Sequence, residues 1–225
     1  MIPSLYSKWS KLFQGDTRTR PTRFHTQDGN LAPWLAYFGL PRAIWQWIRW
    51  RYYGKLVERP WIPPSATRKI QGFLTPDTRV LEIGGGMSTL WLAKRCRSLL
   101  SIEADQKWFD QLRALVVERG LNHVDLQFRW QASEMCDFSS LSDGSLDFCL
   151  IDGGPRLECI QAALPKMKPD GLIYVDNTDL YIPSKEFLLT LPAMHSCRLS
   201  FHRGFAPACL FINEGAFLEM IPANG

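Results

Sequence analysis

Glycines and an acidic residue are grouped where the first strongly apolar run of the chain ends. In the stretch VLEIGGGMSTLWLAK, Glu82 precedes three consecutive glycines, Gly84, Gly85 and Gly86, and Ser88 follows them. Glycines let the backbone turn tightly and approach a bound ligand, and a helix that begins directly behind such a turn directs its N-terminus at the ligand. The stretch therefore predicts a ligand site formed largely by backbone.

The residues around the glycines indicate which ligand this is. A dinucleotide-binding turn carries a third glycine three residues after the second, and counting from Gly86 that position is Thr89. A carboxylate at Glu82 would repel a pyrophosphate, but it suits the cationic amino-acid end of S-adenosylmethionine. Glu103, roughly twenty residues further on, ends the next apolar run and can accept hydrogen bonds from both ribose hydroxyls. S-adenosylmethionine is thus favoured over a nicotinamide cofactor.

Two later apolar runs also end in polar residues. LDFCLIDGGPR ends at Asp152, and GLIYVDNTD ends at Asp176 and Asn177. Ligands of open α/β sheets bind outside the carboxyl ends of the strands, so we expect these three groups together at the edge that holds Glu82.

The elements that must position these residues alternate between strands and helices from residue 60 onward. This alternation predicts an α/β fold with a doubly wound, mostly parallel sheet of seven strands. Helices are expected at about 65–74, 88–95, 107–119, 133–137 and 157–167. The expected strands are 79–83, 98–103, 124–128, 146–151, 172–176, 197–202 and 208–213, the last two joined through HRGFAP.

The motifs between Pro60 and about Asp179 resemble those of class I S-adenosylmethionine-dependent methyltransferases. One subgroup of that family reads PW, VLExGxGxSTLWxA, SxExDxxW, DFxxIDGxxR and GGxIxxDN, and here the order is kept, with Met87 where arginine is frequent and Asp170 in place of a glycine. The resemblance implies a Rossmann-like methyltransferase domain with Asp152 close to the transferable methyl. The predicted cofactor contacts are Glu82, Gly84, Gly85, Gly86, Ser88 and Glu103.

A second similarity concerns metal dependence. Metal-dependent O-methyltransferases of the catechol and caffeoyl-CoA type hold a divalent cation at positions matched here by Asp152, Asp176 and Asn177. Three oxygen ligands suit Mg²⁺ or Ca²⁺. The lysine that those enzymes carry three residues after the first aspartate is Pro155 here, so we keep a metal site as the alternative to metal-independent transfer.

Methyl transfer is an in-line displacement, in which the protein aligns donor and acceptor and handles one proton. We predict Asp152 and Asp176 as the catalytic residues, with Asp152 orienting or deprotonating a hydroxyl or amine of a small-molecule, lipid or sugar acceptor. Arg156 and Arg203 could pair with an anionic group on that acceptor.

Other functions of the same fold stay open. An aminopropyltransferase shares the glycine turn but needs further acids for a polyamine, and DGGPR offers no obvious second one. A nicotinamide oxidoreductase fits less well for the reasons given above. A non-catalytic, membrane-associated protein that binds S-adenosylmethionine is the alternative from outside the enzymes.

The front of the chain is basic and rich in tryptophan. Residues 1–75 hold twelve Lys and Arg against three Asp and Glu, whereas the remainder holds fourteen against nineteen. We therefore divide the chain into a basic segment at 1–59 and the methyltransferase domain at 60–225, with residues 1–30 lying loosely on the surface. A helix predicted at 41–58 is apolar on more than one face. It either packs against the domain or a second copy in a homodimer, or lies on an anionic membrane surface.

Partners and compartment follow from what the sequence lacks. No nucleic-acid motif is present, so no nucleic acid is expected as a partner. Six widely spaced cysteines suggest neither disulfides nor zinc, which favours a cytoplasmic protein, with peripheral membrane binding as the variant. Prolines 33 and 41 interrupt the apolar stretch 31–50 and argue against a membrane span. The basic start of the chain leaves a mitochondrial transit peptide as a further alternative.

Overall fold

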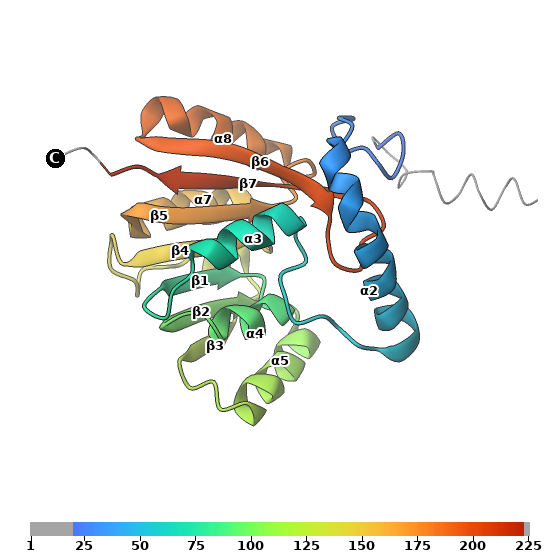
Figure 1. Cartoon of the computed structure of the whole chain (residues 1–225). Helices are drawn as coiled ribbons and strands as arrows, with labels where there is room; N and C mark the ends of the chain where they lie inside the picture. The colour runs from blue at the N-terminus through green and yellow to red at the C-terminus, as the bar shows by residue number, and fades with distance from the viewer. Residues whose placement is uncertain (1–19, 223–225) are drawn as a thin grey trace, which may run out of the picture.

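A seven-stranded sheet with helices on both faces forms the body of the molecule (Figure 1). The computed structural model describes residues 20–222, so most of the basic start of the chain, for which a transit peptide was one alternative, lies outside the described residues. The strand order is β3-β2-β1-β4-β5-β7-β6, in which β7 runs antiparallel to both of its neighbours. The predicted fold class, a doubly wound and mostly parallel sheet with an N-terminal helix, is confirmed.

The first four strands have the bounds that the sequence predicts. Three of them are mostly buried, as parallel strands between helix layers must be, whereas the strand at the sheet edge, residues 124–128, is only partly buried. The four are β1 (Arg79–Ile83), β2 (Ser98–Glu103), β3 (Val124–Phe128) and β4 (Leu146–Ile151).

The last three strands differ from prediction. β5 (Met167–Asp176) begins earlier, and β6 (Cys197–Phe205) continues through the residues expected to form a turn. The final strand was predicted at 208–213, but β7 spans Ile212–Met220. The pattern of β7 is hard to interpret because Glu214, which is completely buried, replaces an apolar residue within it.

Helices cover both faces of the sheet (Figure 1). One apolar cluster lies between the sheet and helices α3 and α4, and another lies between the sheet and α7 and α8. Helix α8 was not predicted, and it contains Pro183 and Pro192, a residue type that is unusual inside helices. The helices of the domain are α3 (Pro64–Phe73), α4 (Met87–Ala93), α5 (Gln106–Glu118), α6 (Ala132–Met135), α7 (Arg156–Ala163) and α8 (Ile182–Met194), with a 3₁₀ turn η2 (Leu164–Lys166) after α7.

The N-terminal helix lies beyond the tips of the parallel strands (Figure 1). It is α2 (Leu40–Tyr53), preceded by a 3₁₀ turn η1 (Trp34–Gly39). The helix ends earlier than predicted because Gly54 adopts a left-handed conformation, with φ +62°. The chain then crosses the edge of the sheet in an extended segment, residues 54–62, before it enters α3.

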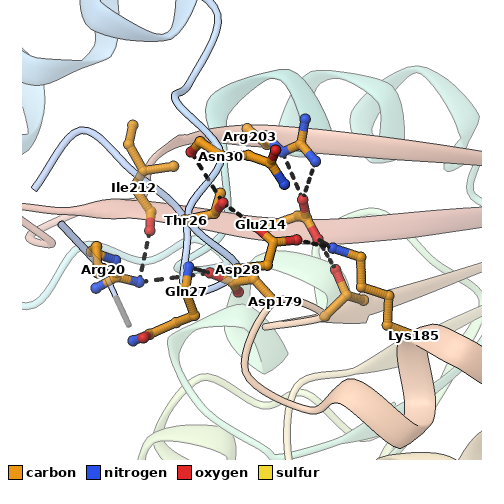
Figure 2. Close-up of polar contacts among 11 residues, drawn as sticks. Arg20, Thr26, Gln27, Asp28, Asn30, Asp179, Lys185, Arg203, Ile212 and Glu214 are labelled. Atoms are coloured by element: carbon orange, nitrogen blue, oxygen red, sulfur yellow. Dashed lines mark hydrogen bonds and ion pairs between the residues drawn. The ribbon is translucent and has the colours of Figure 1, made fainter. Parts of the chain in front are cut away.

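Residues 20–31 are not loosely attached, which corrects the prediction for that part of the chain. They are tied to α8, β6 and β7 by a network of charged groups (Figure 2). At its centre, the buried carboxylate of Glu214 accepts hydrogen bonds from Lys185 over 2.7 Å and from Arg203 over 2.6 Å. Lys185 also pairs with Asp28 from the N-terminal segment, and the backbone amide of Gln27 donates to Asp179. Segments far apart in sequence are therefore joined by groups of opposite charge.

Within residues 20–222, no helix has the length and apolar character needed to cross a membrane.

Candidate active site

The glycine turn is held in place by backbone hydrogen bonds on two sides. The amides of Gly84 and Gly85 both donate to the carbonyl of Ile102 in β2, over 2.9 and 3.0 Å. On the other side, the turn touches the residues that follow β4. Gly84 has φ +93°, and a Cβ added there would lie 2.8 Å from the amide nitrogen of Gly153. Only glycine satisfies both the backbone conformation and the close approach at this position.

Glu82 lies directly beneath this turn and is completely buried. Its Oε2 accepts hydrogen bonds from the hydroxyls of Thr89, over 2.5 Å, and Ser101, over 2.7 Å. Its Oε1 makes no hydrogen bond within the described residues. Burial raises the pKa of Glu82 to about 7, against the opposing effect of the neighbouring hydroxyls. A buried carboxylate oxygen without a partner is costly and suits a site whose ligand brings positive charge.

Glu103 ends the neighbouring strand, on the same side of the turn. One of its oxygens accepts from the amides of Ala104 and Asp105, over 2.9 and 2.7 Å. The other has no hydrogen bond within the part of the chain that the structure describes, and it is the group available to ribose hydroxyls. Burial raises the pKa of Glu103, while the two amides lower it. Glu82 and Glu103 thus flank one glycine turn, as predicted from their spacing.

Two adjoining hollows open at the turn and share Gly84, Gly85, Trp108 and Asp152 in their walls. The Glu103 hollow, about 300 Å³, is also lined by Glu103, Ala104, Met135, Gly153 and Gly154. The Trp61 hollow, about 350 Å³, is also lined by Gly86, Met87, Ser88, Trp50, Leu56, Arg59 and Trp61. Of the six predicted cofactor residues, all but Glu82 line one or both hollows, and Glu82 lies below them.

Trp108 separates the two hollows and was not among the predicted contacts. Its indole Nε1 donates to the carbonyl of Gly85 over 2.9 Å, which fixes the ring over the turn. The helix that carries it begins at Asp105, whose side chain caps the amide of Trp108 over 2.8 Å. The sequence contained Trp108 in its SxExDxxW motif but gave no reason to place the ring here.

The outer wall of the Trp61 hollow comes from the N-terminal segment. Trp50, Leu56, Arg59 and Trp61 all reach it, and the rings of Trp50 and Trp61 meet edge to face with centroids 5.7 Å apart. Glu58 holds this segment to the domain through Lys94, over 2.9 Å, and Arg119, over 2.6 Å. None of these residues was predicted for the site, because their position depends on how residues 54–62 cross the sheet edge.

Asp152 follows β4 and faces both hollows, with 25% of its side chain exposed. Burial raises the pKa of Asp152 to about 6, although the nearby Arg156 guanidinium lowers it. Asp152 therefore borders the glycine turn as its place at a strand end predicted, and its catalytic role stays a prediction.

Asp176 and Asn177 are placed differently. Asp176 is almost fully buried and accepts a hydrogen bond from the hydroxyl of Tyr174 over 3.0 Å, and it lines neither hollow. Burial, together with the charge of Asp152, raises the pKa of Asp176 well above its usual range. Asn177 has φ 57°, and its Oδ1 accepts from Arg156 over 3.1 Å. The predicted catalytic role of Asp176 stays a prediction, and its position suits support of Asp152 better than contact with substrate.

The predicted divalent cation finds no support in this arrangement. The guanidinium of Arg156 occupies the space between two of the expected ligands, 3.1 Å from Asn177 Oδ1 and 3.9 Å from Asp152 Oδ1. It also donates to the carbonyls of Asp152 and Asp176, each over 3.0 Å. No group of three His, Cys, Asp or Glu within residues 20–222 could hold a metal ion. In this arrangement Arg156 supplies the positive charge beside these oxygens.

The two arginines predicted to meet an anionic acceptor are engaged elsewhere. Arg156 is buried in the contacts just described, with its guanidinium over the ring of Tyr181 at 3.9 Å. Arg203 lies within β6 rather than in a loop, and it pairs with the buried Glu214. Neither is free to bind a substrate carboxylate or phosphate.

Comparison with known proteins agrees with this geometry. Residues 81–178 match a family model described as a methyltransferase domain. No curated protein matches the chain. The fold is similar to that of the O-methyltransferase TomG from Streptomyces achromogenes, solved in complex with S-adenosylmethionine (17% identity, TM-score 0.60, covering 80% of this chain and 89% of that one).

Two further solved structures share the fold. One is an rRNA methylase from Streptococcus thermophilus (13% identity, TM-score 0.57, covering 74% and 99%). The other is the cofactor-bound protein Rv0187 from MTB (20% identity, TM-score 0.53, covering 65% and 74%). At this identity the likeness concerns the fold alone.

Proposed function

We propose that the chain, whose residues 81–178 match a methyltransferase-domain family model, transfers a methyl group from S-adenosylmethionine to a hydroxyl or amine of a small-molecule, lipid or sugar acceptor. The observation that carries the proposal is the position of Asp152. It is an acid with a pKa of about 6 that borders both hollows beside the glycine turn. In its ionised form this carboxylate can accept the proton that an acceptor loses.

The residues present suit S-adenosylmethionine by charge. Glu103 offers a free carboxylate oxygen to ribose hydroxyls, and the unpartnered Oε1 of Glu82 supplies negative charge beneath the turn for an ammonium group. Arg59 lines the Trp61 hollow and suits the carboxylate of the methionine part. The cofactor supplies a methyl carbon that its sulfonium has already activated.

The protein then has three tasks. Gly84 to Gly86 and Trp108 hold the donor in one orientation, which removes entropy from the reaction step. The indoles of Trp50 and Trp61 exclude water from the Trp61 hollow. Asp152 orients the acceptor and takes its proton, while Arg156 and Asn177 fix the backbone that carries Asp152. No step requires a metal ion.

Replacement of the acid tests this proposal. We expect Asp152→Asn to lower turnover at least about a hundredfold, the usual contribution of general-base catalysis. Cofactor affinity should stay within several-fold. Turnover is measured as release of S-adenosylhomocysteine against a library of hydroxyl and amine acceptors, and affinity by titration calorimetry. Asp143→Asn is the matched control, because Asp143 is exposed and pairs with Lys166 before β4 begins.

The outcome also separates the other functions of this fold. Binding of S-adenosylmethionine and S-adenosylhomocysteine, without binding of NAD or transfer of an aminopropyl group, is the expected result. Unchanged turnover in Asp152→Asn would remove Asp152 from the reaction. Tight cofactor binding with no acceptor turned over would favour a non-catalytic protein that binds the cofactor.

A further inference from the structure

A further cavity lies apart from the Glu103 and Trp61 hollows, which together form the cofactor cleft, and it is on the side of α3. Its volume is about 530 Å³, and it lies between η1, the start of α2, the start of α3 and the end of β6. We call it the basic pocket, because its walls carry three arginines and a histidine but no acidic residue. It is lined by Pro33, Leu35, Ala36, Phe38, Gly39, Arg42, Pro64, Ser65, Arg68, Phe201, His202, Arg203 and Gly204.

The free positive charge of this pocket comes from two residues. Arg203 is neutralised by Glu214, and His202 shares a 3.0 Å hydrogen bond with Ser65. Burial lowers the pKa of His202, as do the charges of Lys69 and Arg68, against an opposing effect of Glu219. Arg42 and Arg68 are exposed at the pocket and have no hydrogen bond or ion pair with any described residue. Two unpaired guanidinium groups facing one cavity suit a phosphate.

The rim of the basic pocket is apolar and exposed. Phe38 and Leu35 belong to its lining, and their side chains are 73% and 61% exposed. Trp34 is 67% exposed and meets Phe38 edge to face, with ring centroids 5.7 Å apart. Large aromatic side chains that cover nothing within the described chain favour a surface that meets an apolar phase.

Helix α2 continues this character away from the pocket. Its inward side buries Ala43 and Gln46, while Trp45, Arg49 and Tyr52 are exposed at a spacing that places them on the outward side. Residues 29–57 hold four Lys or Arg and no Asp or Glu. Aromatic rings mixed with arginines, without acids, are typical of helices that lie at the headgroup level of a membrane.

We propose that η1 and the outward side of α2 form a docking face for a membrane containing anionic phospholipid, with a headgroup phosphate bound in the basic pocket. Charge complementarity decides for this occupant, because the face offers positive charge and aromatic rings together. A protein partner would need acidic groups set within an apolar surface, whereas an anionic bilayer supplies both as one material. The inference does not depend on the acceptor or on methyl transfer.

Vesicle binding tests the proposal directly. The full chain is sedimented with vesicles of phosphatidylcholine alone and with vesicles of equal parts phosphatidylcholine and phosphatidylglycerol. We expect binding to the mixed vesicles that weakens with salt, and little binding to the neutral ones. The double variant Arg42→Gln/Arg68→Gln should weaken binding about thirtyfold, since each charge near an anionic surface contributes about fivefold. Trp34→Ser/Phe38→Ser should weaken it as well.

Matched controls distinguish binding through this face from nonspecific adsorption of the protein to vesicles. Trp130 is 65% exposed and follows β3, at the edge of the sheet opposite β6. Arg113 is an exposed arginine of α5. Trp130→Ser and Arg113→Gln should bind the vesicles as the unchanged protein does. Circular dichroism and thermal unfolding of every variant show whether the fold is intact.

Several results would overturn the proposal. Equal binding to neutral vesicles, or full binding by both double variants, excludes this face. Calorimetric binding of inorganic phosphate or glycerol 1-phosphate that depends on Arg42 and Arg68, without vesicle binding, assigns the pocket to a soluble anion. Sedimentation velocity that finds a dimer, dispersed by Trp34→Ser/Phe38→Ser, assigns the aromatic face to a second copy of the chain.

Discussion

Glu82 and Asp152 are two carboxyls with raised pKa values whose surroundings differ. Glu82 is sealed beneath the glycine turn with hydroxyl donors on one oxygen only, whereas Asp152 is partly exposed beside an arginine. Desolvation disfavours the ionised form in both cases. For Glu82, desolvation affects the free energy of unfolding as well as cofactor binding, because water does not reach the carboxylate.

Replacing Glu82 with glutamine should therefore change how stability depends on pH. The folded pKa of about 7 lies above the ordinary 4.5, so the native protein holds an extra proton between those values and loses stability as pH rises through that window. Glutamine does not titrate. Relative to the unchanged protein, Glu82→Gln should gain on the order of 3 kcal/mol between pH 4.5 and pH 8, measured by urea denaturation across the range. Parallel stability curves for the two proteins would contradict this account.

The same substitution is expected to weaken S-adenosylmethionine binding. A neutral amide beneath the turn offers no charge to the cofactor's ammonium, and removal of one charged partner typically reduces affinity about tenfold or more. Higher stability at pH 8 together with weaker cofactor binding is a combination that a merely structural carboxylate would not produce. Titration calorimetry at pH 8 measures the second half of it.

For single residues, the sequence predicted the site residues at the ends of strands. It missed those that the path of residues 54–62 brings to the site. Glu82, Glu103 and Asp152 could be predicted because parallel strands bring their carboxyl ends to one edge. Asp176 ends a strand too, but it is almost fully buried, accepts a hydrogen bond from Tyr174 and lines neither hollow. Arg59 and Trp61 carry no local signal, because only the path of residues 54–62 brings them to the cleft.

Among the elements, the extended segment 54–62 is the one that encloses the cleft without belonging to the sheet. It is held to the domain by Glu58, whose two partners Lys94 and Arg119 come from α4 and from the end of α5. These cations lower the pKa of Glu58 to about 2, so the contacts persist at all but strongly acidic pH.

Release of this contact should loosen the outer wall of the Trp61 hollow. We expect Glu58→Gln to raise the dissociation constant for S-adenosylmethionine several-fold, while the free energy of unfolding falls by about 1 kcal/mol or less, as for partly exposed ion pairs. Glu219→Gln is the control, since Glu219 pairs with Lys69 on the other side of α3. Equal effects of the two substitutions on cofactor affinity would mean that Glu58 does not position the wall.

Element bounds followed from the sequence most closely in the first four strands. The bounds of β1 to β4 were predicted to the residue, although each strand contains at least one polar residue. α8 was not predicted, and of its two prolines Pro183 stands in the first turn, where proline is tolerated, whereas Pro192 lies inside the helix. β7 was misplaced because a charged residue, Glu214, is buried within it, and tertiary partners, Lys185 and Arg203 among them, make that possible.

At the scale of the molecule, the network around Glu214 joins the N-terminal segment to the antiparallel side of the sheet (Figure 2). Glu214 is completely buried, so its negative charge is stable only when Lys185 and Arg203 neutralise it. The paired charges come from the N-terminal segment, α8, β6 and β7. Removing one partner of a buried ion pair leaves an uncompensated charge and is strongly destabilising.

Lys185→Ala should consequently destabilise the protein by roughly 3 kcal/mol or more, as expected for a broken buried pair. Lys166→Ala, which removes the partner of the exposed Asp143, should have an effect below about 1 kcal/mol. Urea denaturation compares the two variants, and limited proteolysis shows whether residues 20–31 detach first in Lys185→Ala. If both variants lose the same stability, Glu214 tolerates its burial without Lys185.

Helix α2 borders both the basic pocket and the Trp61 hollow. The start of α2 contributes Arg42 to the basic pocket, and its last turn contributes Trp50 to the wall of the cofactor cleft. Eight residues of α-helix span about 12 Å. The helix is therefore a spacer of fixed length, and in the docking proposed above a bilayer that holds its first turn would set the height and tilt of the Trp61 hollow over the lipid.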